Sequence, residues 1–462
     1  MTATRLRIVV CGGGMAGLTA AVSAAEAGAE VAVLEKGPRV GGTTMLSGGL
    51  VWTWVDPARM QRAIPGGNPV LQELVIRELA AGRRWLGGLG VKFGAEEPFL
   101  GYGWGQRMDP PLALEILLAR LTELGGTVSC ESAVETILTD RGRVTGALVI
   151  DADGDARALA ADAVVLATGG FHGNPELLRR YITDPSHLYV RACSWNTGDG
   201  LIAATAVGAA VTPGLGTFYG HALCAPPARF RPLEFRDASQ IYGTRSVALN
   251  LHGLRFTDES QGTGEEELNQ DLARQPEGRG FYIIDQVTAA IEPRPGRLTR
   301  AMIDWARQRG APVVAAQTMP ELVAGLVAHG LPPGNVTRTL DEYNRACLAG
   351  TAQQLSPPRS AYQAPLLEPP FLAVGVKASI TFTMGGLAVD DNARVLRRSM
   401  SSSPLAQSIT ELSEFREVPI RGLYAAGGDV GNISNRGYAG GLATAITTGR
   451  VAGRHAAMNA GR

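Results

Sequence analysis

The sequence lacks the features that mark metal-binding, disulfide-linked or membrane-spanning proteins. Its 5 cysteines are scattered along 462 residues without a C-x-x-C pair, so neither a zinc site nor a redox dithiol is predicted. No apolar run approaches the length of a membrane span, and the first predicted strand begins too early to leave room for a signal peptide. We therefore expect a reduced, cytoplasmic protein that contacts no membrane.

The sequence also has no excess of charge of either sign. Lys+Arg and Asp+Glu both number 43, so the field of the whole chain gives no reason to expect a nucleic-acid partner. Lysine occurs only at Lys36, Lys92 and Lys377, and we attribute the arginine bias to a GC-rich genome rather than to a binding patch. The charge composition therefore gives no reason to expect nucleic acid or an anionic membrane as a partner, and it assigns no function.

A strand, a glycine-rich turn, a helix and a second strand follow one another near the start of the chain. Residues 8–10 are β-branched, a small-residue helix ends near residue 28, and residues 31–34 form the next apolar run. This order predicts a βαβ unit in a parallel sheet. Strands followed by glycine turns recur at 163–170 and 420–431, so pieces of one α/β domain lie at both ends of the chain.

The middle of the chain has a different character. It is rich in proline and arginine and predicts helices at 297–310, 319–330 and 335–350. Because 462 residues exceed what one core usually supports, we predict an α/β fold in which a Rossmann-type domain is split by an inserted α+β cap. The predicted boundaries are 1–215 and 370–462 for the Rossmann-type domain and 216–369 for the cap. Residues 397–408 are rich in serine and predict a mobile surface loop.

The first turn fits the pattern G-x-G-x-x-G. Gly12 suits the tight turn, Gly14 allows a pyrophosphate to approach the backbone, and Gly17 allows the helix to pack on the strand. Glu35 follows at the end of the second strand, where its carboxylate can accept hydrogen bonds from ribose hydroxyls. These features predict dinucleotide binding. A second Gly/Thr/Ser cluster at 41–54 favours a flavin, because a bare NAD domain does not need such a cradle.

Seven stretches together resemble the FAD-dependent oxidoreductase 2 superfamily, which includes fumarate reductase and 3-ketosteroid Δ1-dehydrogenase. They are VVCGGGMAGLTAA, EKGPRVGGTTMLSGGLVW, LATGGFHGNPELLRRY, NTGDGLIAATAVGA, HGLRFTDES, TMGGLAVD and GLYAAGGDVGN followed by YAGGLATAITTGRVAG. They occur in the order that the family has and cover essentially the whole chain. The resemblance implies an FAD domain that is split by a catalytic cap.

The resemblance also implies a set of residues around FAD. Val134 and Asp199 match positions near the adenine, and Asp429 stands near the acidic ribityl contact, although Gly428 is an extra residue before it. No histidine occurs between residues 41 and 49, where some members attach FAD, so the cofactor is expected to be non-covalent. The other implied contacts are Gly12, Gly14, Met15, Ala16, Gly17, Glu35, Lys36, Gly41, Gly42, Thr43, Thr44, Ser47, Gly48, Gly49, Ala167, Thr168, Gly169, Gly440, Gly441, Leu442 and Ala443.

The fumarate-reductase branch is matched poorly at its substrate residues. Residues 261–264 lack the arginine that donates a proton in that branch, Phe382 replaces a histidine, and Tyr438 replaces a carboxylate-binding arginine. His221 falls near a substrate histidine. The ketosteroid-dehydrogenase branch fits better, since it has a tyrosine at the place of Tyr438, and this tyrosine and the N–H matching Leu442 donate to a substrate carbonyl.

We therefore predict an FAD enzyme that desaturates a C–C bond beside a carbonyl, or reduces the corresponding alkene. In the ketosteroid branch a tyrosine of the cap is the base, and Tyr242 and Tyr219 are the candidates here. A tyrosine with its ordinary pKa of about 10 needs a neighbouring cation to act as a base, and Arg245 is a candidate for that cation.

Other functions stay open on the sequence alone. A flavin monooxygenase or an NAD(P)H-dependent flavin reductase is one alternative, a fumarate-reductase-like enoate reductase is another, and a non-catalytic flavoprotein is a third. No second strand–GxGxxG–helix unit is evident, so we expect electrons to pass between a small carbonyl-containing substrate and an external carrier or oxygen.

Overall fold

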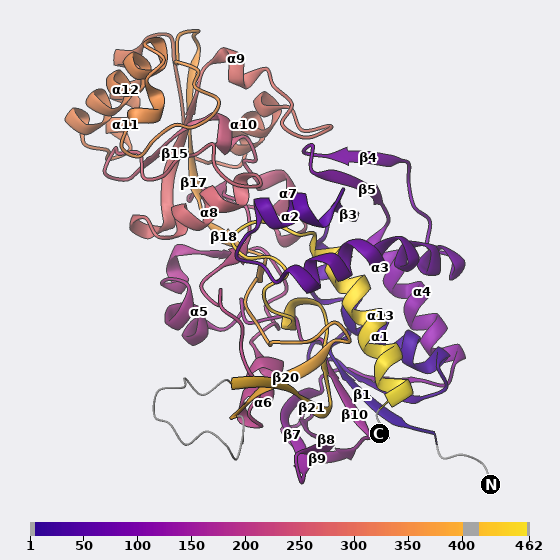
Figure 1. Ribbon diagram of the computed structural model, residues 1–462. Coiled ribbons are helices and arrows are strands. Elements are labelled where there is room, and N and C mark those ends of the chain that lie inside the picture. The colour runs from indigo at the N-terminus through magenta and orange to yellow at the C-terminus, as the bar shows by residue number, and fades with distance from the viewer. Residues whose placement is uncertain (1–4, 401–414, 460–462) are drawn as a thin grey trace.

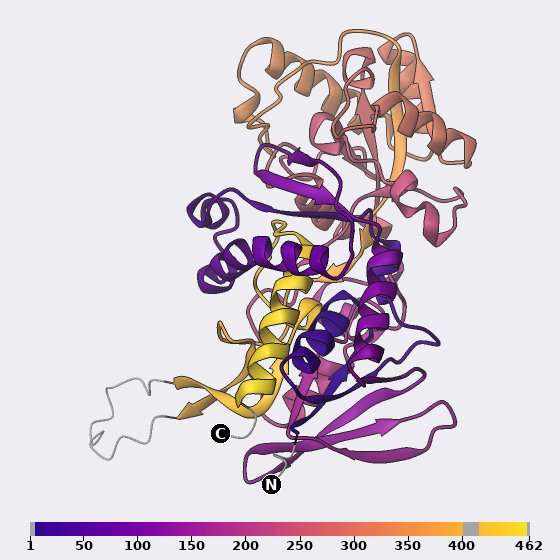
Figure 2. The same ribbon diagram turned by 90° about the vertical axis from the view of Figure 1, so that its right-hand side faces the viewer.

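The computed structural model describes residues 5–400 and 415–459. Strands β7–β9 lie at one end of an elongated molecule, and helices α10–α12 lie at the other (Figure 1). A view from the side shows the same separation between the first and last parts of the chain and its middle (Figure 2). The structure therefore has two main regions, as the sequence predicts.

The first region is built on a nine-stranded sheet with the central order β6-β2-β1-β10-β21-β8-β7. Its first six members pair in parallel, whereas β7, β9 and β20 pair antiparallel at its edges. Strands from both ends of the chain share this sheet, which confirms the predicted split α/β fold. Its strands are β1 Arg7–Cys11, β2 Glu30–Leu34, β6 Thr127–Ser129, β7 Ala133–Asp140, β8 Arg143–Ile150, β9 Ala156–Ala160, β10 Ala163–Leu166, β20 Arg394–Met400 and β21 Phe415–Ala425.

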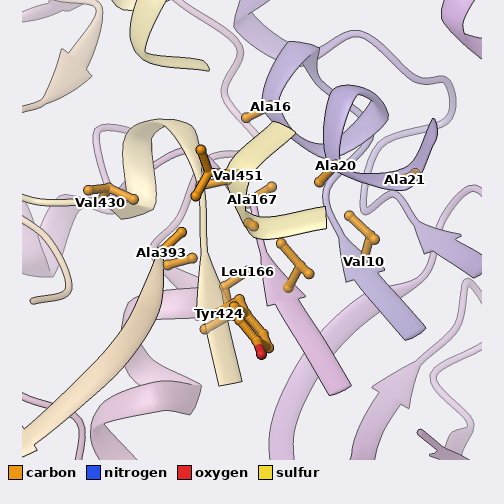
Figure 3. Packing of buried hydrophobic residues seen from close by; sticks show 14 of the residues in the cluster. Val10, Ala16, Ala20, Ala21, Leu166, Ala167, Ala393, Tyr424, Val430 and Val451 are labelled. Atoms are coloured by element: carbon orange, nitrogen blue, oxygen red, sulfur yellow. The ribbon is translucent and has the colours of Figure 1, made fainter. Parts of the chain in front are cut away.

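Small residues allow the first and last helices of this region to pack closely. A Cβ on Gly449 or Gly453 of α13 (Gly441–Asn459) would contact the backbone of Ala16 or Ala20 in α1 (Met15–Glu26). Ala16, Ala20 and Val451 lie together above the strands that carry Val10 and Leu166 (Figure 3). The two ends of the chain are therefore joined by one core as well as by one sheet.

Other helices surround this region and cover parts of it. Helices α3 and α4 contact α13 and α1 respectively, so the amino-terminal part of the chain covers the same core. The bounds are α2 Pro57–Ala63, α3 Pro69–Gly88, α4 Pro110–Glu123, α5 Pro175–Tyr181 and α6 Asp199–Ala206.

The second region is an antiparallel five-stranded sheet with helices around it. Its strands are β13 Leu223–Cys224, β14 Val247–Asn250, β15 Arg279–Ile284, β16 Val313–Ala316 and β17 Phe371–Lys377. Its helices are α7 Phe235–Ala238, α8 Glu265–Ala273, α9 Gln286–Ala289, α10 Thr299–Gln308, α11 Met319–Ala328 and α12 Pro333–Leu348. The last three occur where the sequence predicts helices. The boundary predicted at residue 370 separates β17 from the strands with which it pairs.

Three small sheets lie beside the main ones. Strands β3 Leu50–Trp54, β4 Glu96–Phe99 and β5 Gly103–Arg107 form an antiparallel sheet. The pairs β11 Tyr189–Val190 with β18 Ser379–Ile380 and β12 Phe218–Tyr219 with β19 Phe382–Thr383 join the chain on the two sides of the inserted segment. These pairs bring residues near 219 and 382 next to each other.

Two further observations concern sequence predictions. Residues 397–400 of the predicted surface loop belong to β20, and residues 401–408 lie outside the described residues. Among the described helices, none combines the length and the apolar character that crossing a membrane requires.

Candidate active site

The glycine-rich turn between β1 and α1 has the predicted geometry. Gly12 has φ of 114°, and a Cβ there would collide with the carbonyl oxygen of Ala167. A Cβ on Gly17 would collide with the carbonyl oxygen of Gly12, so glycine is required where α1 packs on the turn. Gly14 is different, because its Cβ would meet no atom closer than 3.7 Å. The absence of a side chain at Gly14 leaves open space beside the start of α1.

Charged residues lie close to this turn. The Glu35 carboxylate accepts hydrogen bonds from the N–H groups of Gly13 at 2.8 Å and Gly37 at 2.7 Å, and it lines the cavity described next. Lys36 forms an ion pair of 3.0 Å with Asp199, at the start of α6. Glu35 is therefore held in place by backbone donors and has lone pairs left for a ligand hydroxyl.

One long cavity collects most of the predicted cofactor residues. It runs from the turn after β1 to the start of α13. The predicted residues that line it are Gly12, Gly14, Met15, Ala16, Glu35, Lys36, Gly42, Thr43, Thr44, Ser47, Gly48, Val134, Ala167, Thr168, Gly169, Asp199, Gly428, Gly441 and Leu442. Because the cavity is continuous between these two points, it can hold an extended ligand.

Six predicted cofactor residues do not line this cavity. The clearest case is Asp429, a buried residue whose carboxylate accepts from the backbone of Thr168 and Gly170. Asp429 therefore holds the turn after β10, and the structure does not place it where it could contact a ribityl chain directly. The others are Gly17, Gly41, Gly49, Gly440 and Ala443.

Several cavity residues were missed by sequence reasoning. They include Arg191, Cys193, Trp195, Asn196, Thr381, Thr383, Met384 and Ser434. These residues lie in irregular segments or in strands of two residues, which carry little periodic signal. The pairing of β11 with β18 brings Arg191 close to Thr381, and only the fold shows that contact.

The start of α13 lies at the far end of the cavity. Gly441, Leu442, Thr444 and Ala445 line it, and the first turn of the helix contains no acidic residue. The first N–H groups of a helix have no partner within the helix, and the helix dipole is positive there. Because α1 also begins on this cavity without an acidic residue in its first turn, two helix starts face one ligand site.

Three aromatic rings stack where this cavity meets a second one. Tyr219 stacks on both Tyr438 and Phe382, with ring centroids 4.1 Å and 5.1 Å away, and the centroids of Phe382 and Tyr438 are 6.4 Å apart. Tyr219 and Tyr438 line both cavities. The Tyr438 hydroxyl accepts a hydrogen bond of 3.0 Å from the N–H of Gly441, so its own proton is free for another acceptor.

Tyr219 is the end of a buried chain of hydrogen bonds. Its hydroxyl lies 3.0 Å from Nε2 of His221, and Nδ1 of His221 lies 2.9 Å from Oε2 of Glu265. The other oxygen of Glu265 accepts from the N–H of Ala222 and from the hydroxyl of Tyr282. In this arrangement one reactive hydroxyl contacts a base, and a third group orients that base, so protons can pass along the chain. We call Tyr219, His221 and Glu265 the relay. Sequence reasoning named Tyr219 and His221 but missed Glu265.

Burial controls the protonation of the relay. Burial lowers the pKa of His221 well below its ordinary value, and the positive charges of Arg294 and Arg191 lower it further. Burial also raises the pKa of Glu265 and of Tyr219 well above their ordinary values. At neutral pH the Tyr219 hydroxyl therefore retains its proton.

The structure places two other candidate residues elsewhere. Tyr242 is fully buried and donates its hydroxyl to Gln240, and it lines neither of the two cavities. Arg245 is exposed and lies over the ring of Tyr362, 3.9 Å from its centroid. The cations that act on the Tyr219 hydroxyl are Arg191 and Arg294. We therefore assign Tyr242 and Arg245 no part in the chemistry.

The glycine-rich turn and the long cavity indicate a dinucleotide-binding protein, and comparison with known proteins identifies the family. A family model described as an FAD binding domain matches residues 106–443, and one described as FAD dependent oxidoreductase matches residues 7–170. The chain therefore belongs to the FAD-dependent oxidoreductase 2 superfamily, whose cofactor is FAD.

Similar proteins come from several bacteria. An NADH:fumarate oxidoreductase of Klebsiella pneumoniae is 25% identical, and the match covers 98% of this chain but 48% of that protein. A vinyl phenol reductase of Lactiplantibacillus plantarum is 27% identical over 98% of this chain and 96% of that protein. The solved 3-ketosteroid-Δ4-(5α)-dehydrogenase of Rhodococcus jostii RHA1 has the same fold, with a TM-score of 0.72 at 23% identity over 99% and 98% of the two chains. The chain thus spans about half the length of the Klebsiella relative.

The cavity fits FAD in shape and in chemistry. The open space at Gly14 allows a pyrophosphate to lie against the start of α1, where unpaired N–H groups favour negative charge. The Glu35 carboxylate, an acceptor of the kind that suits ribose hydroxyls, lines the same cavity as the start of α13. Residues from both ends of the chain therefore form one cofactor site.

Proposed function

We propose that this protein moves a hydride to or from a carbon–carbon bond beside a carbonyl group. The observation that carries the proposal is the position of Tyr219, which faces both cavities and ends the relay. FAD supplies the hydride acceptor or donor when it is bound. The protein then has to polarise the carbonyl, transfer a proton at the neighbouring carbon and exclude water.

Tyr438 and the start of α13 suit the first task. The Tyr438 hydroxyl is oriented by the N–H of Gly441, and Leu442 lines the same part of the cavity. Two donors aimed at a carbonyl oxygen stabilise the enolate charge that develops there by several kcal/mol in a dry site. The stacked rings of Tyr219 and Phe382 help to keep this region apolar.

The relay suits the second task in both directions. To reduce an alkene, the Tyr219 hydroxyl gives its proton to the α-carbon, His221 returns one from Nε2, and Glu265 returns one to Nδ1. For desaturation each proton moves the opposite way. Because Tyr219 is protonated at neutral pH, the resting site is prepared for reduction.

We also propose that FAD is bound non-covalently. The bound cofactor exchanges electrons with an external electron carrier. No histidine occurs in residues 41–49, and the sequence has a single strand–GxGxxG–helix unit. The name of the Klebsiella relative, an NADH:fumarate oxidoreductase that is about twice as long, is consistent with a carrier site on another part or another chain.

Enoate reduction is a second candidate, in which the activating carbonyl is itself a carboxylate. The arginines beside Tyr219 favour it, since they would attract such a group. Tyr438 and Phe382 fit a neutral carbonyl better, because neither provides positive charge.

Tyr219→Phe tests the proposal. The variant keeps the stacked ring and removes the proton, so FAD content should be unchanged while turnover falls by about 10²–10⁴. Tyr242→Phe is the matched control, because that hydroxyl lies outside both cavities, and it should retain activity. Tyr219→Phe with normal turnover would contradict the proposed proton transfer.

A further inference from the structure

The second cavity extends from the aromatic stack toward the cap. It shares Arg191, Tyr219 and Tyr438 with the cofactor cavity, so the two are continuous. The apolar residues that line it are Trp52, Phe99, Leu50, Pro98 and Ile241. A ligand in this cavity would place one end against Tyr219.

The lining of this cavity is also rich in positive charge. Five arginines line it, namely Arg107, Arg191, Arg236, Arg294 and Arg297. Among the described residues, Glu97 is the single acidic residue in this lining. Three of the arginines have carboxylate partners, at 2.8 Å for Arg107, 3.4 Å for Arg294 and 3.3 Å for Arg297. The ion pairs found in residues 5–400 and 415–459 involve neither Arg191 nor Arg236.

Two of these arginines have unused hydrogen-bond donors in buried positions. Arg191 donates from Nη1 to Thr381 at 3.1 Å, but its buried Nε has no partner. Arg297 has a side chain that is 11% exposed and donates from Nη2 to the carbonyl of Ser239, and its Nε also has no partner. A buried donor without an acceptor costs about 1–3 kcal/mol, so the fold holds both guanidinium groups here at a cost in free energy.

The arginines also repel one another. Burial lowers the pKa of Arg297, and three neighbouring guanidinium groups lower it further, against the opposite effect of Asp237. Burial likewise lowers the pKa of Arg191. An anion bound in this cavity would relieve the repulsion among the guanidinium groups that line it.

We propose that the second cavity binds a carboxylate on the carbon skeleton of the substrate, which is therefore an anionic ketone or enone. The apolar side chains hold the carbon skeleton, the arginines hold the charge, and the carbonyl reaches Tyr438. The reacting end rests on the proposed function, but the anion site does not. A neutral steroid would leave these arginines unpaired.

Binding to the FAD-loaded protein tests this site without turnover. Isothermal titration calorimetry would compare laevulinate, a small keto acid, with laevulinamide, its uncharged analogue, and with inorganic phosphate. We expect laevulinate to bind at least about tenfold more tightly than the amide and more tightly than phosphate. Equal binding of the amide, or tighter binding of phosphate, would overturn the carboxylate assignment.

Three variants locate the site. Arg191→Gln and Arg297→Gln should each weaken laevulinate binding by roughly tenfold or more and leave laevulinamide unaffected. Arg236→Gln, at an exposed residue without an ion pair, should weaken it by a few-fold without disturbing folding. Arg307→Gln, on the outer face of α10, removes the same charge and should change nothing.

The outcomes separate the two proposals. Unchanged laevulinate binding in all three cavity variants would overturn the anion site, whatever the protein catalyses. Binding that the variants abolish, in a protein that oxidises or reduces no keto acid or enone acid, would leave the anion site standing and reject the proposed function.

Discussion

At the scale of single residues, the proposed active site combines side chains from the cofactor region with side chains from the cap. Tyr438 comes from the loop before the last helix, and Tyr219 comes from the segment that leads into the cap, yet their rings lie 4.1 Å apart. His221 and Glu265 lie behind Tyr219, where burial keeps the histidine neutral. The proposed proton transfer therefore depends on contacts made across the two regions.

Glu265→Gln tests whether Glu265 supplies a proton to His221 during turnover. Glutamine can still accept from the N–H of Ala222, but it cannot exchange a proton with His221. We expect kcat to fall by about tenfold or more, with KM and FAD content nearly unchanged. The pKa of Glu265 is raised, so wild-type reduction should slow as pH rises and this group loses its proton, and the variant should lose that dependence.

Tyr282→Phe provides the control for this pH profile. It removes the other hydroxyl that contacts Glu265 but leaves the relay intact. Its pH profile should keep the wild-type shape. A Glu265→Gln variant whose rate and pH profile match the wild type would mean that Glu265 has only a structural role.

Gly14→Val should separate FAD binding from folding. Gly14 has φ of −80° and ψ of −173°, which suit valine, and no atom lies within 3.7 Å of its Cβ position. The added methyl groups would occupy the space proposed for the pyrophosphate. We expect a folded protein with the wild-type circular dichroism spectrum and a flavin content reduced at least tenfold, on the order of 1.4 kcal/mol in affinity.

Gly334→Val is a suitable control for this loss of flavin. That glycine lies in α12 with no atom near its Cβ position, and it is remote from both cavities. The control should contain a full complement of FAD. Full flavin content in Gly14→Val itself would show that the cofactor does not approach this backbone.

At the scale of elements, the packing of α13 on α1 ties the cofactor site together. Both helices begin on the cofactor cavity, and both carry small residues where they touch. A change at this contact therefore affects the stability of the region and the position of the two helix starts.

Gly453→Ala should destabilise the protein by about 1–3 kcal/mol, because the added methyl group would overlap the backbone of Ala20. Gly87→Ala near the end of α3 makes the same chemical change in open space and should be neutral or stabilise by up to about 1 kcal/mol. Chemical denaturation measures both values. Equal stability of the two variants would contradict the close packing of the helices.

The elements differ in how well the sequence predicts them. The βαβ unit and helices α10–α12 were predictable, because glycine punctuation and helical periodicity are local signals. Strand β17 pairs with β15 across the boundary predicted at residue 370, and such a pairing of residues far apart in the sequence leaves no local signal. Glu265 and Arg191 could not be placed for the same reason: their partners, His221 and Thr381, come from other segments.

At the scale of the whole molecule, the two ends of the chain form the cofactor region and the middle covers it. From composition alone we attribute the excess of arginine over lysine to a GC-rich genome rather than to a binding patch, because alanine and glycine are also abundant. The fold shows instead that five of the arginines line a cavity beside Tyr219. The arrangement supports a single enzyme site with FAD on one side and a carbonyl-bearing substrate on the other.

Anaerobic mixing tests this account most directly. The visible flavin absorption would be followed after the oxidised holoprotein meets saturated keto acids, and after the reduced holoprotein meets the matching enone acids. The account predicts that the absorption falls in the first case or returns in the second, and that product made in D₂O carries deuterium at the α-carbon. A folded, FAD-loaded protein whose absorption responds in neither direction would contradict it.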